Sequence, residues 1–148
     1  MKKLYFFLLV ILASLAFSFD FEPYAGWNFT IDSSNTSSFY SVFLDFPLTV
    51  NNDTEFGISL GYIGTNNFVL QSFGKYNIKT SFGIFTTYGK GGAVFSSDFK
   101  LNSIGYSVLA GVRYYFKNFF VGFSYAVYYI EDEKIGTIPL EVGYKIEF

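Results

Sequence analysis

The chain has 148 residues, of which 51% are apolar, 24% are aromatic and only 15% are charged, and its formal net charge is -2. It contains no Cys and no His, which excludes disulfides, thiolate catalysis and lipid attachment at Cys, and removes the most common general base and metal ligand. There is no basic patch, so we expect no nucleic acid as a partner.

Residues 1–18 read as a cleaved secretory signal. Lys2 and Lys3 precede an apolar run, and Ala16-Phe17-Ser18 places small residues at the two recognition positions before the cleavage site. An uncleaved membrane helix is the alternative, but the run is shorter than the ~20 apolar residues that a span needs. We therefore expect a signal peptide at 1–18 and one β-barrel domain at 19–148.

Apolar and polar residues alternate through most of the remaining chain. A β-strand places successive side chains on opposite faces, so this pattern predicts strands with one apolar face. The clearest case is the last stretch, in which every even residue from Ile138 to Phe148 is apolar and no odd residue is a large apolar one. In chain order the pattern predicts eight strands, at residues 21–31, 39–50, 55–64, 68–77, 80–89, 105–116, 119–130 and 138–148.

Two of these strands have an irregular pattern. In 68–77 the apolar face is interrupted by Ser72 and Gly74 while Phe73 falls on the other face, and a β-bulge would reconcile the two. In 80–89 we expect Phe85 on the inner face. The residues expected on the outer face of 80–89 are Phe82, Ile84 and Tyr88.

The predicted connections are short after the second, fourth and sixth strands and longer after the first, fifth and seventh, with an exception after the third. The longer ones are 32–38, 90–104 and 131–137. This asymmetry is typical of outer-membrane barrels, which have short periplasmic turns and longer outside loops.

Outward aromatic residues gather at both ends of the predicted strands, as in proteins whose rings lie at the two membrane interfaces. At the presumed outer edge they are Phe29, Tyr40, Tyr62, Phe68, Tyr88, Tyr106 and Tyr129. At the opposite edge they are Phe21, Phe46, Phe56, Phe82, Phe116, Phe119 and Phe148.

The charged residues of the strands fall on the inward face, where they avoid the cost of roughly 2–4 kcal/mol for a charge facing lipid at mid-depth. They are Glu22, Asp45, Glu55, Lys75, Arg113, Glu141, Lys145 and Glu147. We expect Arg113 to bridge to Glu141 or Asp45. An eight-stranded barrel is narrow enough for side chains to fill. The bulky residues expected to do so are Tyr24, Phe43, Phe85, Leu109, Tyr115, Phe120 and Tyr128.

The signal, the eight segments and the terminal pattern Leu140-x-Val142-x-Tyr144-x-Ile146-x-Phe148 resemble the small OmpA/OmpX-like eight-stranded outer-membrane β-barrel proteins. The resemblance is one of pattern and covers nearly all of the mature chain. It implies an all-β, closed, antiparallel up-and-down transmembrane barrel, preceded by a helical signal peptide and surrounded by outer-membrane lipid. It also implies that Tyr144, Ile146 and Phe148 form the signal read by the outer-membrane assembly machinery.

The leading hypothesis for function is a structural, anchoring or surface-interaction role through the outside loops. Residues 90–104 are the candidate site for an extracellular partner. One alternative is a narrow channel or a carrier of small hydrophobic ligands, with a cavity ringed by Arg113, Glu141 and Lys145. Another is a soluble periplasmic lipocalin-like barrel.

We do not expect an enzyme, and we predict no catalytic, cofactor-binding or metal-binding residues. Ser97 and Lys100 form a conceivable pair of nucleophile and base, but neighbouring polar residues in a loop usually have no catalytic role.

Overall fold

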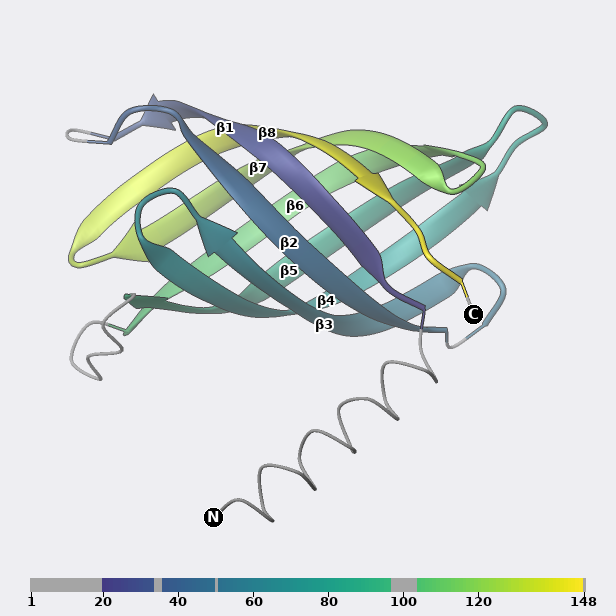
Figure 1. The fold of residues 1–148 in the computed structure, drawn as a ribbon, viewed down its shortest axis with the longest axis horizontal. Helices are drawn as coiled ribbons and strands as arrows, with labels where there is room; N and C mark the ends of the chain where they lie inside the picture. Colours follow the sequence, from purple (N-terminus) through teal and green to yellow (C-terminus); the bar gives the residue numbers. More distant parts are fainter. Residues whose placement is uncertain (1–19, 34–35, 50, 97–103, 148) are drawn as a thin grey trace, which may run out of the picture.

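The computed structural model describes residues 20–33, 36–49, 51–96 and 104–147. It shows eight strands that close into one barrel in chain order, which confirms the predicted fold class (Figure 1). The strands are β1 Glu22–Asp32, β2 Phe39–Thr49, β3 Thr54–Ile63, β4 Asn67–Lys79, β5 Ile84–Ser96, β6 Ile104–Phe116, β7 Phe119–Ile130 and β8 Glu133–Tyr144. Within the described ranges, no helix is long and apolar enough to cross a membrane.

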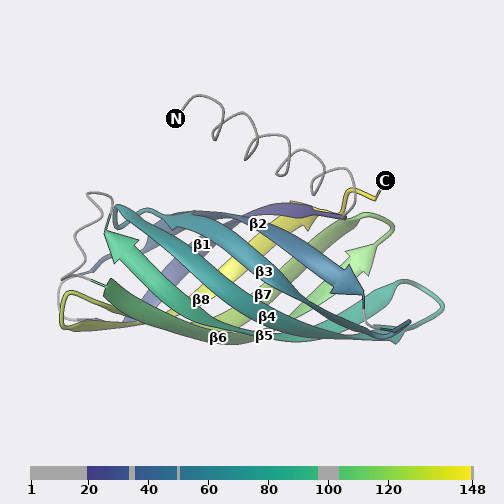
Figure 2. The ribbon, with the colours of Figure 1, turned by 90° about the horizontal axis from the view of Figure 1, so that it is seen from below.

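Each strand pairs antiparallel with the next, and β1 pairs with β8 to close the wall (Figures 1 and 2). A bridge between Phe21 and Ile146 extends this closure beyond the two strands. We call the end where β1 begins and β8 ends the terminal mouth, and the opposite end the loop mouth. The loop mouth receives the connections that follow β1, β3, β5 and β7.

The two faces of the wall differ as the alternation predicts. Along β7, for example, Phe123 and Tyr125 are exposed on the outside whereas Ser124 and Ala126 are buried inside. Large apolar side chains cover the exterior on every strand, and the interior holds most of the buried charged and amide groups. A closed barrel leaves no unpaired strand edge, which is the condition for β-structure in lipid.

Strand β4 has the predicted phase but needs no bulge. Its register with β3 and with β5 runs without interruption, so the bulge hypothesis is wrong. Phe73 is buried inside, and Ser72 lies on the outer face, where its hydroxyl donates to the Gly91 carbonyl at 3.4 Å. The apolar face of β4 is therefore interrupted by a small polar residue, Ser72, whose hydroxyl is hydrogen-bonded to the neighbouring strand β5.

Strand β5 has the opposite phase from the prediction. Tyr88 is buried in the interior, and Phe85 is 45% exposed on the outside. Phe82 precedes the strand, in the turn after β4. Between Phe85 and Ala93 the outer face of β5 carries only Thr87 and two glycines, whereas Tyr88 and Lys90 are buried inside. Over this stretch the larger residues point inward, and the usual contrast between faces is reversed. Tyr88 is therefore not part of the outer aromatic edge, and Phe85 does not fill the interior, so both predictions are wrong.

Two predicted loops are largely strand. The pairing of β5 with β6 continues to Phe95 and Ile104, so residues 90–96 belong to the wall, and 97–103 lie outside the described residues. The connection after β7 consists of Glu131 and Asp132, both with positive φ, as a two-residue hairpin turn of type I′ requires. The loop after β7 is therefore as short as the Lys117-Asn118 turn, and the predicted asymmetry of the connections is weaker than expected.

Candidate functional site: the barrel interior and its loop mouth

The half of the interior nearer the terminal mouth holds six interacting charged side chains, which we call the ionic cluster. They are Glu22, Asp45, Lys75, Lys90, Arg113 and Glu141. Three cations face three carboxylates, and all six side chains are buried. Because they come from six different strands, their contacts cross the lumen and connect opposite walls.

Arg113 contacts all three carboxylates. Its Nη1 lies 3.0 Å from Asp45 Oδ2 and 3.3 Å from Glu22 Oε2, and its Nε lies 2.9 Å from Glu141 Oε2. The guanidinium also lies over the rings of Tyr24 and Phe120, at 4.3 and 4.5 Å from their centroids. Planar stacking and several directed donors are the properties that suit arginine to such a buried position.

The two lysines complete the neutralisation. Lys90 Nζ donates to both oxygens of Asp45, at 2.6 and 2.7 Å, and to the Tyr24 hydroxyl at 2.7 Å. Lys75 Nζ donates to Glu22 and lies 3.7 Å from Asp45. A buried charge is tolerated only when it is paired and hydrogen-bonded, and both lysines meet this condition.

Two tyrosine hydroxyls supply further donors to the carboxylates. Tyr88 donates to Glu141 Oε1 at 2.6 Å, and Tyr115 donates to Glu22 Oε2 at 2.9 Å. The inward phase of β5 therefore has a physical reason, because it brings both Tyr88 and Lys90 to this cluster.

The structure places the eight predicted interior charges in two groups. Five of them belong to the ionic cluster. The sixth member of the cluster, Lys90, was not predicted, because residues 90–104 were expected to form a loop. Glu55 and Lys145 lie at the terminal mouth, 3.5 Å apart. Glu147 also contacts Lys145, at 3.3 Å, but its side chain is 56% exposed because the chain has left the last strand. Glu147 is thus a residue of the mouth and not of the interior.

Lys145 lies beyond the end of β8, among acidic groups. Burial alone would lower the pKa of its ammonium group, but the carboxylates of Glu55, Glu22 and Glu147 outweigh burial and raise the pKa. Of the predicted terminal signal, Tyr144 is exposed on the outer face and Ile146 pairs with Phe21, and Phe148 lies outside the described residues.

The half of the interior nearer the loop mouth is filled differently. Six buried apolar side chains, which we call the apolar plug, lie here: Phe39, Ile63, Val69, Val94, Ile130 and Ile135. Between the plug and the ionic cluster, buried amides pair with hydroxyls. Asn28 donates to Ser41 at 2.9 Å, and Gln71 donates to Ser107 at 2.8 Å. The lumen is therefore occupied by side chains at each of these levels.

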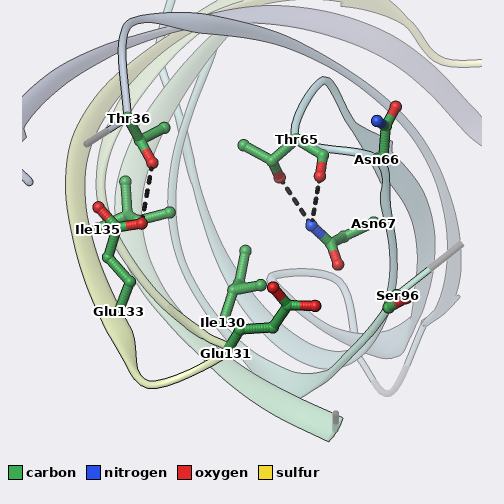
Figure 3. Close-up of a pocket in the computed structure, with 9 residues that line it drawn as sticks. All are labelled: Thr36, Thr65, Asn66, Asn67, Ser96, Ile130, Glu131, Glu133 and Ile135. Atoms are coloured by element: carbon green, nitrogen blue, oxygen red, sulfur yellow. Dashed lines mark hydrogen bonds between the residues drawn. The ribbon is translucent and has the colours of Figure 1, made fainter. Parts of the chain in front are cut away.

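Above the plug, the loop mouth contains a cavity of about 510 Å³, which we call the mouth cavity. Figure 3 shows Glu133 with Thr36 on one side, Thr65 and Asn67 on the other, and the Glu131 carboxylate between them. The nine lining residues are Thr36, Thr65, Asn66, Asn67, Ser96, Ile130, Glu131, Glu133 and Ile135. The sequence reading missed this cavity because its walls come from connections far apart in the chain.

Several lining residues are held by local hydrogen bonds. Thr36 Oγ1 donates to Glu133 Oε2 at 3.3 Å, and Ser33 donates to the other oxygen of the same carboxylate. Asn67 Nδ2 donates to the carbonyl and the hydroxyl of Thr65, at 2.7 and 2.9 Å. Among the described residues, no three Asp or Glu residues come together in a way that could hold a metal ion.

Comparison with known proteins identifies the fold. No protein-family model and no curated protein sequence matches the chain. Neisserial surface protein A is 18% identical with a TM-score of 0.56, and the match covers 88% of this chain and 97% of that one. Ail, the attachment invasion locus protein of Yersinia pestis, is 16% identical with a TM-score of 0.55, covering 86% and 97%.

A third solved structure, the N-terminal β-barrel domain of OprF from Pseudomonas aeruginosa, is 18% identical with a TM-score of 0.53, and the match covers 86% of this chain and 96% of that one. All three are small outer-membrane barrels. The chain therefore has the fold of these barrels, and its apolar exterior together with this fold supports an outer-membrane location.

Proposed function

We propose that the protein is a closed outer-membrane barrel with a structural, anchoring or surface-interaction role exerted at its loop mouth. The observation that carries this proposal is the filled interior. The ionic cluster leaves Arg113 with no exposed surface, and the apolar plug lies between the cluster and the mouth cavity. Such a barrel holds its loops at the membrane surface without offering a path for solutes.

The filled interior also weighs against the two alternatives that require an open lumen. A narrow channel needs charged residues that face water, but Arg113 and Glu141 are buried and bonded to each other. A carrier with a cavity ringed by Arg113, Glu141 and Lys145 would need these three side chains around one empty space. Instead Arg113 and Glu141 are in contact inside the ionic cluster, and Lys145 lies at the terminal mouth with Glu55.

The names of the structural neighbours fit a surface role. One is called a surface protein and another an attachment invasion locus protein. We extend to this chain only the general idea of a role at the cell surface. We propose no catalytic activity, and Ser97 and Lys100 lie outside the described residues.

The absence of a solute path is tested by adding the mature protein to liposomes and to planar bilayers. We expect neither sugar-driven swelling nor stable conductance steps, while a general porin added to the same lipid gives both. Porin-like swelling would contradict the proposal.

The orientation is tested with an epitope inserted between Glu131 and Asp132, the turn between β7 and β8. Antibody should label this epitope on intact cells, whereas an epitope appended after residue 148 should be labelled only after the outer membrane is permeabilised. The reverse pattern would place the loop mouth on the periplasmic side and remove the surface role.

We further propose that the terminal residues Tyr144, Ile146 and Phe148 are read by the outer-membrane assembly machinery. The outward position of Tyr144 and the alternating pattern of the last strand support this proposal. Deleting Phe148 should lower the amount of folded barrel in outer membranes several-fold, measured as the heat-modifiable band on gels. Glu147→Gln, which leaves the aromatic end intact, is the control and should assemble normally.

A further inference from the structure

A layer of buried polar side chains separates the ionic cluster from the apolar plug, and we call it the polar belt. Its members are Asn28, Ser41, Gln71, Ser107 and Thr137, and each is at most 3% exposed. On β8, for example, Thr137 is buried between Ile135 of the plug and Glu141 of the cluster. The belt is therefore separated from both mouths by a filled layer.

Two atoms of the belt lack the hydrogen bonds that burial demands. Thr137 Oγ1 and Asn28 Oδ1 have no partner among the residues that the structure describes. The orientation of the Asn28 amide follows from its other contact, because Nδ2 lies 3.3 Å from the Phe39 carbonyl oxygen, which can only accept. Buried polar atoms in native proteins are nearly always bonded, either to the protein or to ordered water.

The two unpartnered atoms belong to neighbouring strands. β8 pairs with β1 so that Thr137 lies opposite Thr30 and Asn28 lies opposite Pro139. Thr137 and Asn28 are therefore diagonal neighbours on the inner face, a relation in which the two residues are about 7–8 Å apart. A single water molecule with two hydrogen bonds of about 2.8 Å spans the gap between two short side chains at this separation.

The chemistry of the two atoms points to a neutral ligand that both donates and accepts. The hydroxyl of Thr137 has a proton to donate, whereas Asn28 Oδ1 can only accept. A cation would leave the Thr137 proton without an acceptor. It would also add charge beside the ionic cluster, in which three cations already balance three carboxylates. Water meets both requirements, and a buried water typically makes about three such bonds.

We propose that the polar belt binds internal water, with one molecule that accepts from Thr137 Oγ1 and donates to Asn28 Oδ1. Gln71 supplies a second position, because its Nε2 donates to Ser107 at 2.8 Å while its Oε1 has no partner among the described residues. The water is enclosed by the ionic cluster and the plug, so it exchanges only when the barrel opens and provides no path for solutes. This inference goes beyond the proposed function, since it holds for either orientation of the barrel.

The first test is a crystal structure of the mature protein in detergent, at a resolution that shows ordered water. We expect density for one water molecule within hydrogen-bonding distance of both Thr137 Oγ1 and Asn28 Oδ1. A direct bond between the two side chains, or no density between them, would overturn the proposal.

The second test is the stability of Thr137→Val, which removes the hydroxyl and keeps the shape of the side chain. If the hydroxyl is bonded to water, the variant should unfold at a lower urea concentration in lipid vesicles, because a bond is lost and Asn28 Oδ1 remains buried. If the hydroxyl is unbonded, the same variant should unfold at a higher urea concentration, because an unpaired buried group is removed. An unchanged or raised urea midpoint therefore contradicts the proposal.

Thr86→Val is the matched control. Thr86 is also fully buried, but its hydroxyl donates directly to Asn77 Oδ1 at 2.6 Å, so its removal should lower the urea midpoint whether or not the belt contains water. The shift for Thr137→Val should have the same sign and a similar size. The swelling, conductance and epitope experiments decide the proposed function separately. A file of water that continued through the apolar plug would contradict the closed barrel but would leave the Thr137 site in place.

Discussion

The two halves of the barrel interior are equally buried, but they are filled by opposite kinds of chemistry. In the ionic cluster each side chain has specific partners on another strand, with contacts such as the 2.9 Å pair of Arg113 and Glu141. In the apolar plug the side chains need only volume and close contact. Removing one member of a hydrogen-bonded ionic network leaves its partners buried and unpaired, whereas the side chains around a truncated apolar residue can partly relax. The two halves should therefore respond differently to substitution, and the loop mouth should tolerate the most.

Removing Arg113 is expected to have the largest effect. Arg113→Leu would leave three buried carboxylates facing only two cations, and loss of one partner of a buried ion pair costs about 3–5 kcal/mol. Equilibrium unfolding in urea with lipid vesicles measures this change. Stability equal to the wild type would mean that the lumen is hydrated enough to solvate the carboxylates.

Adding an arginine at the position before Arg113 tests the difference between inside and outside. Val112 precedes Arg113 on β6 and pairs with Phe123 on the outer face. Val112→Arg should lower the free energy of unfolding by about 2–4 kcal/mol, because the charge would face lipid. The heat-modifiable band on gels reports the folded fraction in lipid, and an unchanged yield would contradict the outward assignment.

The apolar plug should be more forgiving. Ile63 is fully buried among the apolar side chains of the plug, and Ile63→Ala should cost about 2 kcal/mol, at the low end for such a truncation because these neighbours can partly relax. Ile58→Ala on the same strand faces outward and is the control, since lipid chains can replace its lost contacts. A larger loss for Ile58 than for Ile63 would reverse the proposed roles of the two faces.

An exposed ion pair should matter least. Lys134 and Asp32 lie 2.9 Å apart near the loop mouth, with about half of each side chain exposed. Lys134→Ala should change the free energy of unfolding by less than about 1 kcal/mol, and salt should reduce the difference further. A loss comparable to that of Arg113→Leu would show that burial does not separate the two kinds of pair.

The barrel was predictable from the sequence because most strands contrast clearly between faces. In β6 and β7 the outward residues are mostly apolar, and most inward ones are small, charged or aromatic, with Leu109 and Ile130 as exceptions, so alternation determines their phase. The predicted phase of β5 was wrong because its outward positions include Thr87, Gly89 and Gly91, which carry little apolar surface. Applying the rule that strand charges face inward to Lys90 would have given the correct phase.

The sites were predictable to different degrees for a related reason. The contacts of Arg113 with Glu141 and Asp45 follow from placing inward charges in one narrow lumen, and both contacts are present. The mouth cavity depends on where β8 begins. Charges at Glu131 and Glu133 suggested a loop, whereas the chain forms a two-residue turn and returns directly to the wall. A sequence pattern cannot show which side chains a tight turn directs over the lumen.

The lumen-crossing contacts of the ionic cluster also bear on how the chain folds. Arg113 reaches Glu22 and Asp45, which lie 91 and 68 residues away in sequence. Such contacts form only after many strands have been arranged, so the loop-closure entropy is spent before they contribute. A strand displaced by one residue would turn its charge toward lipid and leave its partners unpaired. The cluster therefore couples correct strand register to closure, and it penalises barrels that close incorrectly.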